Sequence, residues 1–448
     1  MDTICALATA PGGALGIIRV SGANAHEILS RIFSKNLTSA QAGTVHYGHV
    51  KDGEEIVDEV LVSIFRAPHS YTGENCAELS CHGSTYILNK VLSLLIQQGC
   101  RTAQPGEFTQ RAFLNGKMDL SQAEAVADLI ASRNKATHQM AMSQLRGGIS
   151  TELSKLRDQL LHLTTLLELE LDFSDHEDLE FADRTELITL AEKMDGHLTR
   201  LAQTFETGQA LKQGIPVAIV GKTNVGKSTL LNQLVGENRA IVSDIHGTTR
   251  DTIEETIDIN GVQFRFIDTA GLRDTQDKVE QIGIERTIQK IRQARIVIWL
   301  LDQCPSQSEL DEMAALSKDK NRIYVHNKTD LINLKDFNPY VLPLSLISAK
   351  KGEGIDRLKQ RIYEEAELAG LTNDANEIII SNTRHYDALI HAHEGIQNVL
   401  IGLNQQLSGD LIAEHLRHVL STLGEITGGT ITSQETLNNI FSHFCVGK

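Results

Sequence analysis

The sequence predicts a multidomain α/β protein built from an α+β N-terminal domain, a helical domain and an α/β domain inserted into the helical one. Three observations predict this order. Short strand-like runs punctuated by Gly and Pro extend to about Lys117, and a Pro-free helical texture follows from Asp119 to about Gln209. The helical texture returns after about Asn376, and strands and helices alternate in the segment between, which starts at Ile215. Because the termini of a domain often lie close together, insertion of one domain into another explains this order.

The N-terminal segment, residues 1–117, is expected to form a compact α+β domain. Apolar runs at residues 17–20 and 60–65 are bounded by turn residues, which is typical of strands. Residues 86–97 are expected to form a helix that ends at Gly99.

The two helical stretches, residues 118–210 and 375–448, are expected to form one domain around the inserted residues 211–374. Five leucines alternate steps of three and four, the apolar stripe of a bundle or coiled-coil helix: Leu153, Leu156, Leu160, Leu163 and Leu167. In the second stretch, helical spacing is indicated by Leu389, Ile396 and Leu400, and a further helix by Leu411, His415 and Leu416.

The inserted segment begins with a phosphate-binding motif. Residues 215–220 are typical of a buried strand, and they run into residues 221–228 (Gly-Lys-Thr-Asn-Val-Gly-Lys-Ser) and then into a helix-forming stretch. This is a P-loop in its strand–loop–helix context. Backbone N–H groups of such a loop wrap phosphates, and the helix N-terminus adds the positive end of its dipole. We therefore expect Lys227 to reach the β- and γ-phosphates and Ser228 to hold Mg²⁺.

The base is indicated by a second motif. Asn327-Lys328-Thr329-Asp330 follows a strand at residues 322–326, as a base-reading loop should. A carboxylate at Asp330 can accept hydrogen bonds from N1–H and the exocyclic amine of guanine, whereas adenine has no N1 donor. Ser348-Ala349-Lys350 is expected to supply backbone to the guanine carbonyl oxygen.

Two further motifs complete a Ras-like P-loop G domain for GTP. Asp268-Thr269-Ala270-Gly271 ends a strand at residues 264–267 and is expected to bring a carboxylate near Mg²⁺ and a glycine N–H near the γ-phosphate. The segment Gly247-Thr248-Thr249-Arg250-Asp251 can donate a threonine hydroxyl to the metal. One position departs from Ras-like proteins, because Leu272 stands where they carry a water-orienting Gln. Glu280 is the carboxylate that could replace it, and a solvated switch-loop charge is the alternative.

Composition limits the remaining possibilities. The chain has 448 residues, and 42 Lys+Arg against 58 Asp+Glu give a net charge of −16. This excludes binding of nucleic acid through the average field, but not through a local basic groove. Six Cys without a C-x-x-C pair favour neither a disulfide framework nor a four-Cys zinc site. No apolar run of membrane-spanning length and no lipidation signal is found, so a reducing cytoplasm is the expected compartment.

Beyond these general motifs, several strings resemble the MnmE (TrmE) family of tRNA-modifying GTPases over essentially the whole chain. In the N-terminal part they are residues 11–13 and 16–22, Tyr71-Thr72-Gly73-Glu74, and residues 105–109 and 111–117. At the other end is the tail Cys445-Val446-Gly447-Lys448. The GTPase motifs are common to many proteins, so the N-terminal strings and the tail make the resemblance narrow.

The resemblance implies partners and cofactors. It implies a homodimer formed through the N-terminal domain, which in the family binds 5-formyl-tetrahydrofolate or a related one-carbon folate. It implies work with the FAD-dependent MnmG partner, in a heterotetramer or larger complex, on carbon 5 of the wobble uridine of certain tRNAs, giving an aminomethyl-type substituent. It also implies G domains that dimerise transiently, with K⁺ in place of an arginine finger and no membrane association.

Matching positions carry the family's site residues onto this chain. Asn224, Ser243, Ile245 and Thr248 match the K⁺ site, Ser228 and Thr249 match the Mg²⁺ ligands, and Glu280 matches the carboxylate that orients water. Arg19, Glu78, Lys117 and Lys448 match folate-associated positions. The whole GTP-contacting set is Asn224, Val225, Gly226, Lys227, Ser228, Thr229, Ser243, Asp244, Ile245, His246, Gly247, Thr248, Thr249, Asp268, Thr269, Ala270, Gly271, Asn327, Lys328, Asp330, Ser348, Ala349 and Lys350.

Two alternatives stay open. Cys445 is a candidate catalytic residue for the tRNA modification, or a thiol that acts only by position. An Era-like, GTP-controlled assembly or RNA-binding factor without one-carbon chemistry would carry the same central motifs, and binding of a reduced folate distinguishes the two functions.

Overall fold

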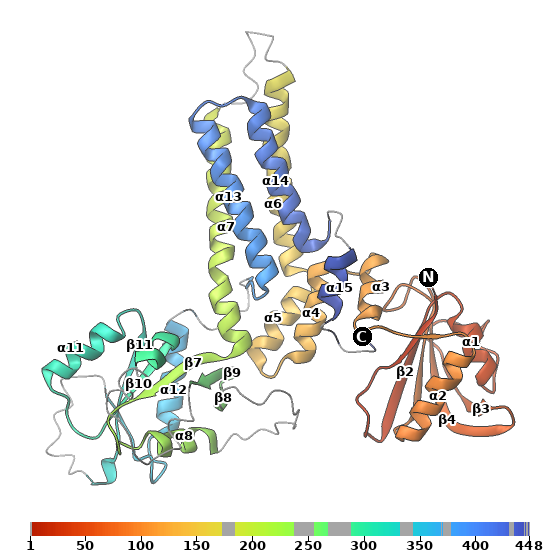
Figure 1. Cartoon of the computed structure of the whole chain (residues 1–448), viewed down its shortest axis with the longest axis horizontal. Helices are drawn as coiled ribbons and strands as arrows, with labels where there is room; N and C mark the ends of the chain where they lie inside the picture. Colours follow the sequence, from red (N-terminus) through yellow and green to blue (C-terminus); the bar gives the residue numbers. More distant parts are fainter. Residues whose placement is uncertain are drawn as a thin grey trace. The chain divides into compact units, whose positions relative to one another are not determined.

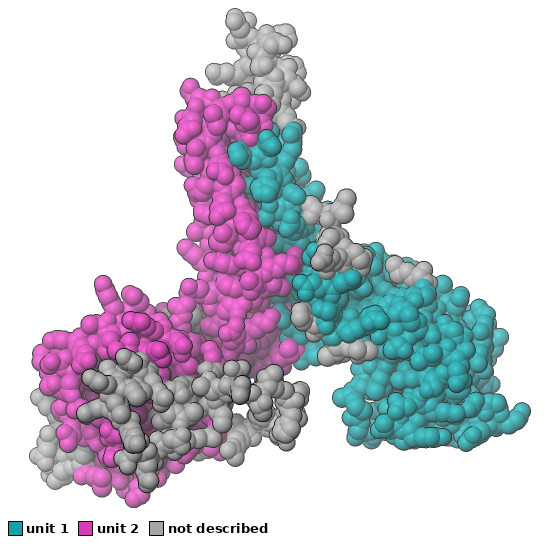
Figure 2. All heavy atoms as spheres, in the orientation of Figure 1, with its two compact units in different colours: residues 1–130, 144–172, 413–448 teal, residues 131–143, 173–412 magenta. Residues whose placement is uncertain are grey.

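The computed structural model describes residues 2–172, 184–236, 255–267, 288–331, 344–368, 370, 378–429, 434–442, 444 and 447. The chain divides into two compact units (Figure 2). Unit 1 comprises Met1–Ile130, Gln144–Asp172 and Ala413–Lys448, and unit 2 comprises Ala131–Ser143 and Phe173–Ile412. The units follow tertiary contacts and divide individual helices, so the domain boundaries given above stay predictions.

Unit 1 begins with a six-stranded sheet, of which Figure 1 labels β2, β3 and β4. Its strand order is β3-β4-β5-β2-β1-β6. Its strands are β1 (Ile4–Leu7), β2 (Leu15–Ser21), β3 (Val45–Asp52), β4 (Glu55–Phe65), β5 (Cys76–His82) and β6 (Arg101–Thr102). Only the β1–β6 pair is parallel among these. One face is covered by α1 (Ala25–Ile32) and α2 (Thr85–Gln97), whose apolar side chains share a buried cluster with β2, β4 and β5. The two strands and the helix expected in this region are confirmed.

Helices form the rest of unit 1. They are α3 (Glu107–Leu114), α4 (Leu120–Ala131), α6 (Gly148–Asp172), most of α14 (Gly409–Thr427) and α15 (Gln434–Ser442). All five leucines of the predicted stripe on α6 are buried. The helix expected around Leu416 is confirmed as α14, but its buried face is Ile412, Leu416, Val419 and Leu423, while Leu411 and His415 are exposed. Leu437, Phe441 and Phe444 pack with Leu120 and Ala123, which fixes the last described segment to α4.

Unit 2 contains a second sheet, ordered β12-β11-β10-β7-β9-β8. Its strands are β7 (Ile215–Val220), β8 (Glu255–Ile259), β9 (Val262–Phe266), β10 (Ile296–Leu301), β11 (Asn321–His326) and β12 (Leu344–Leu346). All described pairs are parallel except β8–β9. Side chains alternate across the strands, so β7 contributes Val217 and Ile219 to one face and Ala218 and Val220 to the other.

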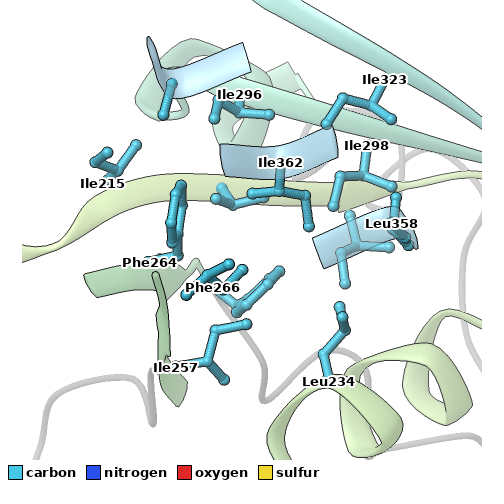
Figure 3. Close-up of a cluster of buried hydrophobic side chains, with 14 of the residues drawn as sticks. Ile215, Leu234, Ile257, Phe264, Phe266, Ile296, Ile298, Ile323, Leu358 and Ile362 are labelled. Atoms are coloured by element: carbon cyan, nitrogen blue, oxygen red, sulfur yellow. The ribbon is translucent and has the colours of Figure 1, made fainter. Parts of the chain in front are cut away.

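Helices cover both faces of this sheet, which is the doubly wound arrangement expected for a G domain. On one face, Leu234 of α8 (Lys227–Gly236) and Leu358 and Ile362 of α12 (Ile355–Leu368) gather against the strands (Figure 3). On the other face, α11 (Gln307–Leu316) packs against β10. The predicted fold class is confirmed.

Unit 2 also contains helices outside its sheet layers. They are α5 (Lys135–Leu145), which the unit division crosses after Ser143, α7 (Arg184–Gln213) and α13 (Thr383–Asn404). Phe205 of α7 stacks on Tyr386 of α13 with ring centroids 4.3 Å apart. No described helix combines the length and apolarity needed to cross a bilayer.

Candidate functional site

The P-loop follows the carboxyl end of β7, a central strand of the second sheet, at the point where the strand order reverses. The chain leaves β7, passes through residues 221–226 and enters α8 at Lys227. The neighbours of β7 are β9 on one side and β10 on the other. In an open α/β sheet, ligands bind in the crevice beyond the carboxyl ends of the strands at such a switch point. The loop is therefore where a nucleotide is expected.

Gly226 allows the loop to approach the neighbouring strand closely. Its φ is +101°, a conformation that favours glycine, and a Cβ atom there would lie 2.3 Å from Nδ2 of Asn327. Any side chain at this position would displace Asn327 or the loop. Because Gly226 has no side chain, the loop backbone packs directly against Asn327, which follows β11.

Lys227 is held inside the loop. Its Nζ donates hydrogen bonds to the carbonyl oxygens of Gly221 and Lys222, both at 2.7 Å. Burial lowers the pKa of Lys227, and the positive charge of Lys290 lowers this pKa further. An anion bound in the loop would stabilise the charged form of Lys227, because it offsets both effects.

The first turn of α8 presents further donors. The first bond of the helix runs from Leu230 N–H to Gly226 C=O, so the N–H groups of Lys227, Ser228 and Thr229 have no partner within the helix. Val225 is buried, Ser228 is half-buried, and Asn224 and Thr229 are exposed. Asn224 adopts a φ of +60°. A helix N-terminus with this geometry suits a phosphate.

Asn327 connects three loops of the site. Only 3% of this residue is exposed. Its Nδ2 donates to the carbonyl oxygen of Val225 at 2.8 Å, and its Oδ1 accepts from the N–H of Ala349 at 2.9 Å. Its own N–H donates to the carbonyl oxygen of Leu301 at 2.7 Å. Asn327 therefore fixes the P-loop, the end of β10 and the 348–350 segment relative to one another.

Asp330 lies beside that hub. The hydroxyl of Ser348 donates to Oδ1 of Asp330 at 2.8 Å. This bond is the main cause that holds the pKa of Asp330 below its usual value, and the charges of Lys351 and Lys350 lower it further. The carboxylate is therefore ionised at neutral pH and can only accept hydrogen bonds. Lys328, whose φ is +63°, pairs with Asp302 at 2.8 Å.

A second group of predicted residues meets in unit 1. Arg19 and Glu78 are direct partners across β2 and β5, and Nη2 of Arg19 lies 2.8 Å from Oε1 of Glu78. The Arg19 guanidinium lies 5.3 Å from the ring centre of Tyr71 and 5.6 Å from that of Phe108. Nη1 of Arg19 donates to the carbonyl oxygen of Gly447 at 3.3 Å. The C-terminal tail thus reaches the N-terminal sheet of the same unit.

Lys117 lies elsewhere on this domain. Its Nζ donates to the carbonyl oxygen of Pro68 at 3.0 Å. Within the described contacts it is not joined to Arg19 or Glu78. The structure therefore brings together two of the three described folate-associated positions.

Other predicted residues lie outside the described part of the chain. They are Ser243, Asp244, Ile245, His246, Gly247, Thr248, Thr249, Asp268, Thr269, Ala270, Gly271, Glu280, Cys445 and Lys448. The described members of the expected K⁺ and Mg²⁺ sites are Asn224 and Ser228.

Sequence reasoning missed three contributors. Asp302 pairs with Lys328, and it stands directly after β10, so its place at the carboxyl end of a parallel strand was a usable signal. Tyr71 and Phe108 flank Arg19, but nothing in their spacing indicated that they meet it.

The chain is similar in sequence to two known domain families and to several known proteins. The sequence family "MnmE helical domain" matches residues 120–445, and "GTP-binding protein TrmE N-terminus" matches residues 3–117. Proteins named "tRNA modification GTPase MnmE" align along 100% of this chain. The one from Phocaeicola vulgatus is 52% identical and covered over 99% of its length, that from Bacteroides thetaiotaomicron 52% and 99%, and that from Parabacteroides distasonis 51% and 100%. The solved G domain of the T. maritima FeoB iron transporter is 24% identical, with 34% of this chain and 98% of that chain covered and a TM-score of 0.25.

Proposed function

The chain belongs to the MnmE family of tRNA modification GTPases, and on that premise we propose that it hydrolyses GTP as one component of a complex that modifies carbon 5 of the wobble uridine of certain tRNAs. The substituent is of the aminomethyl type, and the work is done in the cytoplasm. The observation that carries the proposal is that one chain contains two sites. One is a guanine-nucleotide site organised by Asn327, and the other is a polar site on the N-terminal sheet, to which the C-terminal tail is bonded.

GTP is bound through the P-loop and read by Asp330. The donors at the start of α8 and the cation of Lys227 suit phosphates. The ionised Asp330 accepts from N1–H and the exocyclic amine of guanine, whereas an adenine ring has no N1 donor to offer it. Ala349 and Lys350 belong to the loop proposed for the base, and the bond from Ala349 to Asn327 supports this role.

The metal ligands are oxygen atoms, as hard cations require. Ser228 and Thr249 hold Mg²⁺, and Asn224, Ser243, Ile245 and Thr248 hold K⁺. When bound, these ions supply positive charge to the β- and γ-phosphates, in the role that an arginine finger has elsewhere. Asn224 is an exposed residue of the P-loop. Pairing of two G domains drives hydrolysis, and it depends on K⁺.

Glu280 positions the attacking water. Leu272 follows Gly271, so a side chain able to orient water is absent from the position that Ras-like proteins use. Glu280, eight positions after Leu272, is the carboxylate that we assign to orienting the water.

The site on the N-terminal sheet binds 5-formyl-tetrahydrofolate. Glu78 is an acceptor, Arg19 is a cation near two aromatic rings, and both side chains are partly exposed, so they are accessible to a heteroaromatic ligand with polar edges. Lys117 and Lys448 complete the set toward the carboxylates of the cofactor. Since the carbonyl of Gly447 accepts from Arg19, the tail is held at the sheet, which supports a role for Cys445 in the modification.

A second copy of the chain covers the open face of the N-terminal sheet. Tyr47 and Leu61 are direct partners across β3 and β4 and are 55% and 47% exposed. Val60 and Val62 point to the buried face, so Leu61 points away from it. An exposed apolar row on a sheet marks an interaction surface. The dimer works with the FAD-dependent MnmG partner and tRNA.

The alternative function is an Era-like assembly factor that binds GTP and RNA without one-carbon chemistry. Titration calorimetry of the purified full-length chain with 5-formyl-tetrahydrofolate separates the two. We expect binding that Arg19→Ala weakens at least tenfold, with unchanged GTP affinity. A chain that hydrolyses GTP but binds no reduced folate would favour the alternative.

A further inference from the structure

The hairpin formed by β8 and β9 touches α5 at its turn. Asn260 and Gly261 form the turn, with φ values of +54° and +82°, typical of a two-residue type I′ connection. The carbonyl oxygen of Gly261 accepts a hydrogen bond from the N–H of Ala136 at 3.0 Å. Figure 1 shows the hairpin beside α5.

This contact caps the helix. Asn134 precedes α5, and its Oδ1 accepts from the N–H of Thr137 at 2.9 Å. Gly261 supplies the acceptor for Ala136, another N–H of the first turn, which has no partner inside the helix. The start of α5 is therefore completed by a carbonyl from a strand turn more than a hundred residues away in the sequence.

Close packing surrounds the bond. A Cβ atom on Gly261 would lie 2.8 Å from Cβ of Lys135, so the turn fits only as glycine. Ala136 and Met140 of α5 belong to the same buried cluster as Ile257 and Ile259 of β8. Asp258 holds the turn, because its Oδ1 accepts from the N–H of Gly261 at 2.9 Å.

The other end of the hairpin adjoins the nucleotide site in the sequence. β8 begins shortly after the segment that carries Thr248 and Thr249, and β9 ends two residues before Asp268. Two paired strands of this length form a stiff element roughly 15 Å long. A displacement at one end therefore reaches the other.

We propose that the Asn260–Gly261 turn passes the nucleotide state of the G domain to α5 through the Gly261–Ala136 hydrogen bond. The inference rests on the proposed GTPase function and adds a route by which that activity is coupled to the helices. α5 ends at Leu145 and α6 begins at Gly148, so α5 leads along the chain to α6. Hydrolysis itself does not require the contact.

Hydrogen–deuterium exchange of the full-length chain tests the proposal. It is measured on peptides from residues 132–145, without nucleotide and with a non-hydrolysable GTP analogue, Mg²⁺ and K⁺. In the wild type, exchange at the start of α5 should differ between the two states. In Gly261→Ala it should be faster by roughly fivefold, the size expected for one net hydrogen bond, and no longer respond to nucleotide. GTP turnover should stay within about twofold.

Matched variants identify the cause. Gly53→Ala places alanine at another hairpin turn of positive φ, +61°, where nothing lies within 4 Å, so it should leave α5 exchange unchanged. Lys135→Gly removes the clashing Cβ and should restore the nucleotide response when combined with Gly261→Ala. Asp258→Ala removes the acceptor for the N–H of Gly261 and should reproduce the loss if Gly261→Ala does not fold.

The outcomes separate failure of the coupling from failure of the proposed function. A wild-type chain that hydrolyses GTP while α5 exchange ignores nucleotide overturns the coupling and leaves the proposed function standing. A nucleotide response that survives in both Gly261→Ala and Asp258→Ala does the same. A chain that binds no guanine nucleotide overturns the proposed function, and the coupling with it.

Discussion

The side-chain amide of Asn327 donates a hydrogen bond to the carbonyl oxygen of Val225 at 2.8 Å, although 102 positions separate the two residues. The same side chain accepts from the N–H of Ala349. A single side-chain amide thus links the P-loop with the segment of residues 348–350. We therefore expect the binding of the phosphates and of the base to depend together on Asn327, whose side chain bonds to both loops.

Asn327→Ala should weaken both stability and nucleotide binding. The variant leaves the buried carbonyl of Val225 and the buried N–H of Ala349 without their partner. Each unpaired group lowers the free energy of unfolding by about 1–3 kcal/mol. We expect a lower midpoint in urea unfolding and at least tenfold weaker GTP binding. Asn404→Ala, an exposed asparagine on α13, is the control and should change neither. Unaltered GTP affinity in Asn327→Ala would contradict the linking role.

Asp330→Asn should change which base is bound. The amide replaces an acceptor by a donor, which suits the carbonyl at position 2 of xanthine and opposes the amine of guanine. Competition between GTP and XTP for the purified chain should shift toward XTP by more than tenfold. Asp311→Asn on the exposed side of α11 serves as the matched control. If Asp330→Asn still prefers GTP as the wild type does, the base is read elsewhere.

Hydrolysis should be faster in K⁺ than in Na⁺, and Asn224 should be required for the difference. Because Asn224 has a φ of +60°, Asn224→Ala combines loss of the side chain with backbone strain. Asn224→Gly removes the side chain without that strain. Both variants should bind GTP and lose the preference for K⁺. Equal wild-type rates in the two salts would exclude the role of K⁺.

Glu280→Ala should slow hydrolysis on the order of a hundredfold, the usual size for a group that positions a proton transfer or a water molecule. Nucleotide affinity should hardly change, since the carboxylate acts on water. Single-turnover hydrolysis with excess enzyme measures the step directly. Near-normal turnover would show that Glu280 is only a solvated charge of its loop.

Cys445→Ser should leave GTP hydrolysis intact and abolish the tRNA modification. The tail reaches the N-terminal sheet through the bond between Arg19 and the carbonyl of Gly447, so a thiol two residues earlier is within the same segment. Mass spectrometry of wobble nucleosides from a deletion strain carrying each variant gives the result. Cys304→Ser, an exposed cysteine of the G domain, is the control. Full modification by Cys445→Ser would reduce the tail to a structural role.

Much of the fold follows from short stretches of sequence. The P-loop, the base-reading loop and the leucine stripe of α6 were all predicted, because each depends on local periodicity or on a contiguous motif. The pattern of two helical stretches around an α/β segment also indicated the insertion. The buried face of α14 did not follow from the spacing, because Ile412 is buried there and Leu411 is exposed.

The sequence by itself determined which motifs are present: a P-loop, the Asn327–Asp330 motif with its carboxylate, and the strings that relate the chain to its family. Only the tertiary structure decided which of these residues meet. Strand register makes Arg19 and Glu78 partners, a hydrogen bond joins Arg19 to the carbonyl oxygen of Gly447, and the β8–β9 turn meets Ala136. Such contacts join residues far apart in the chain, and their geometry depends on how sheets and helices pack together, which no local pattern of residue types specifies.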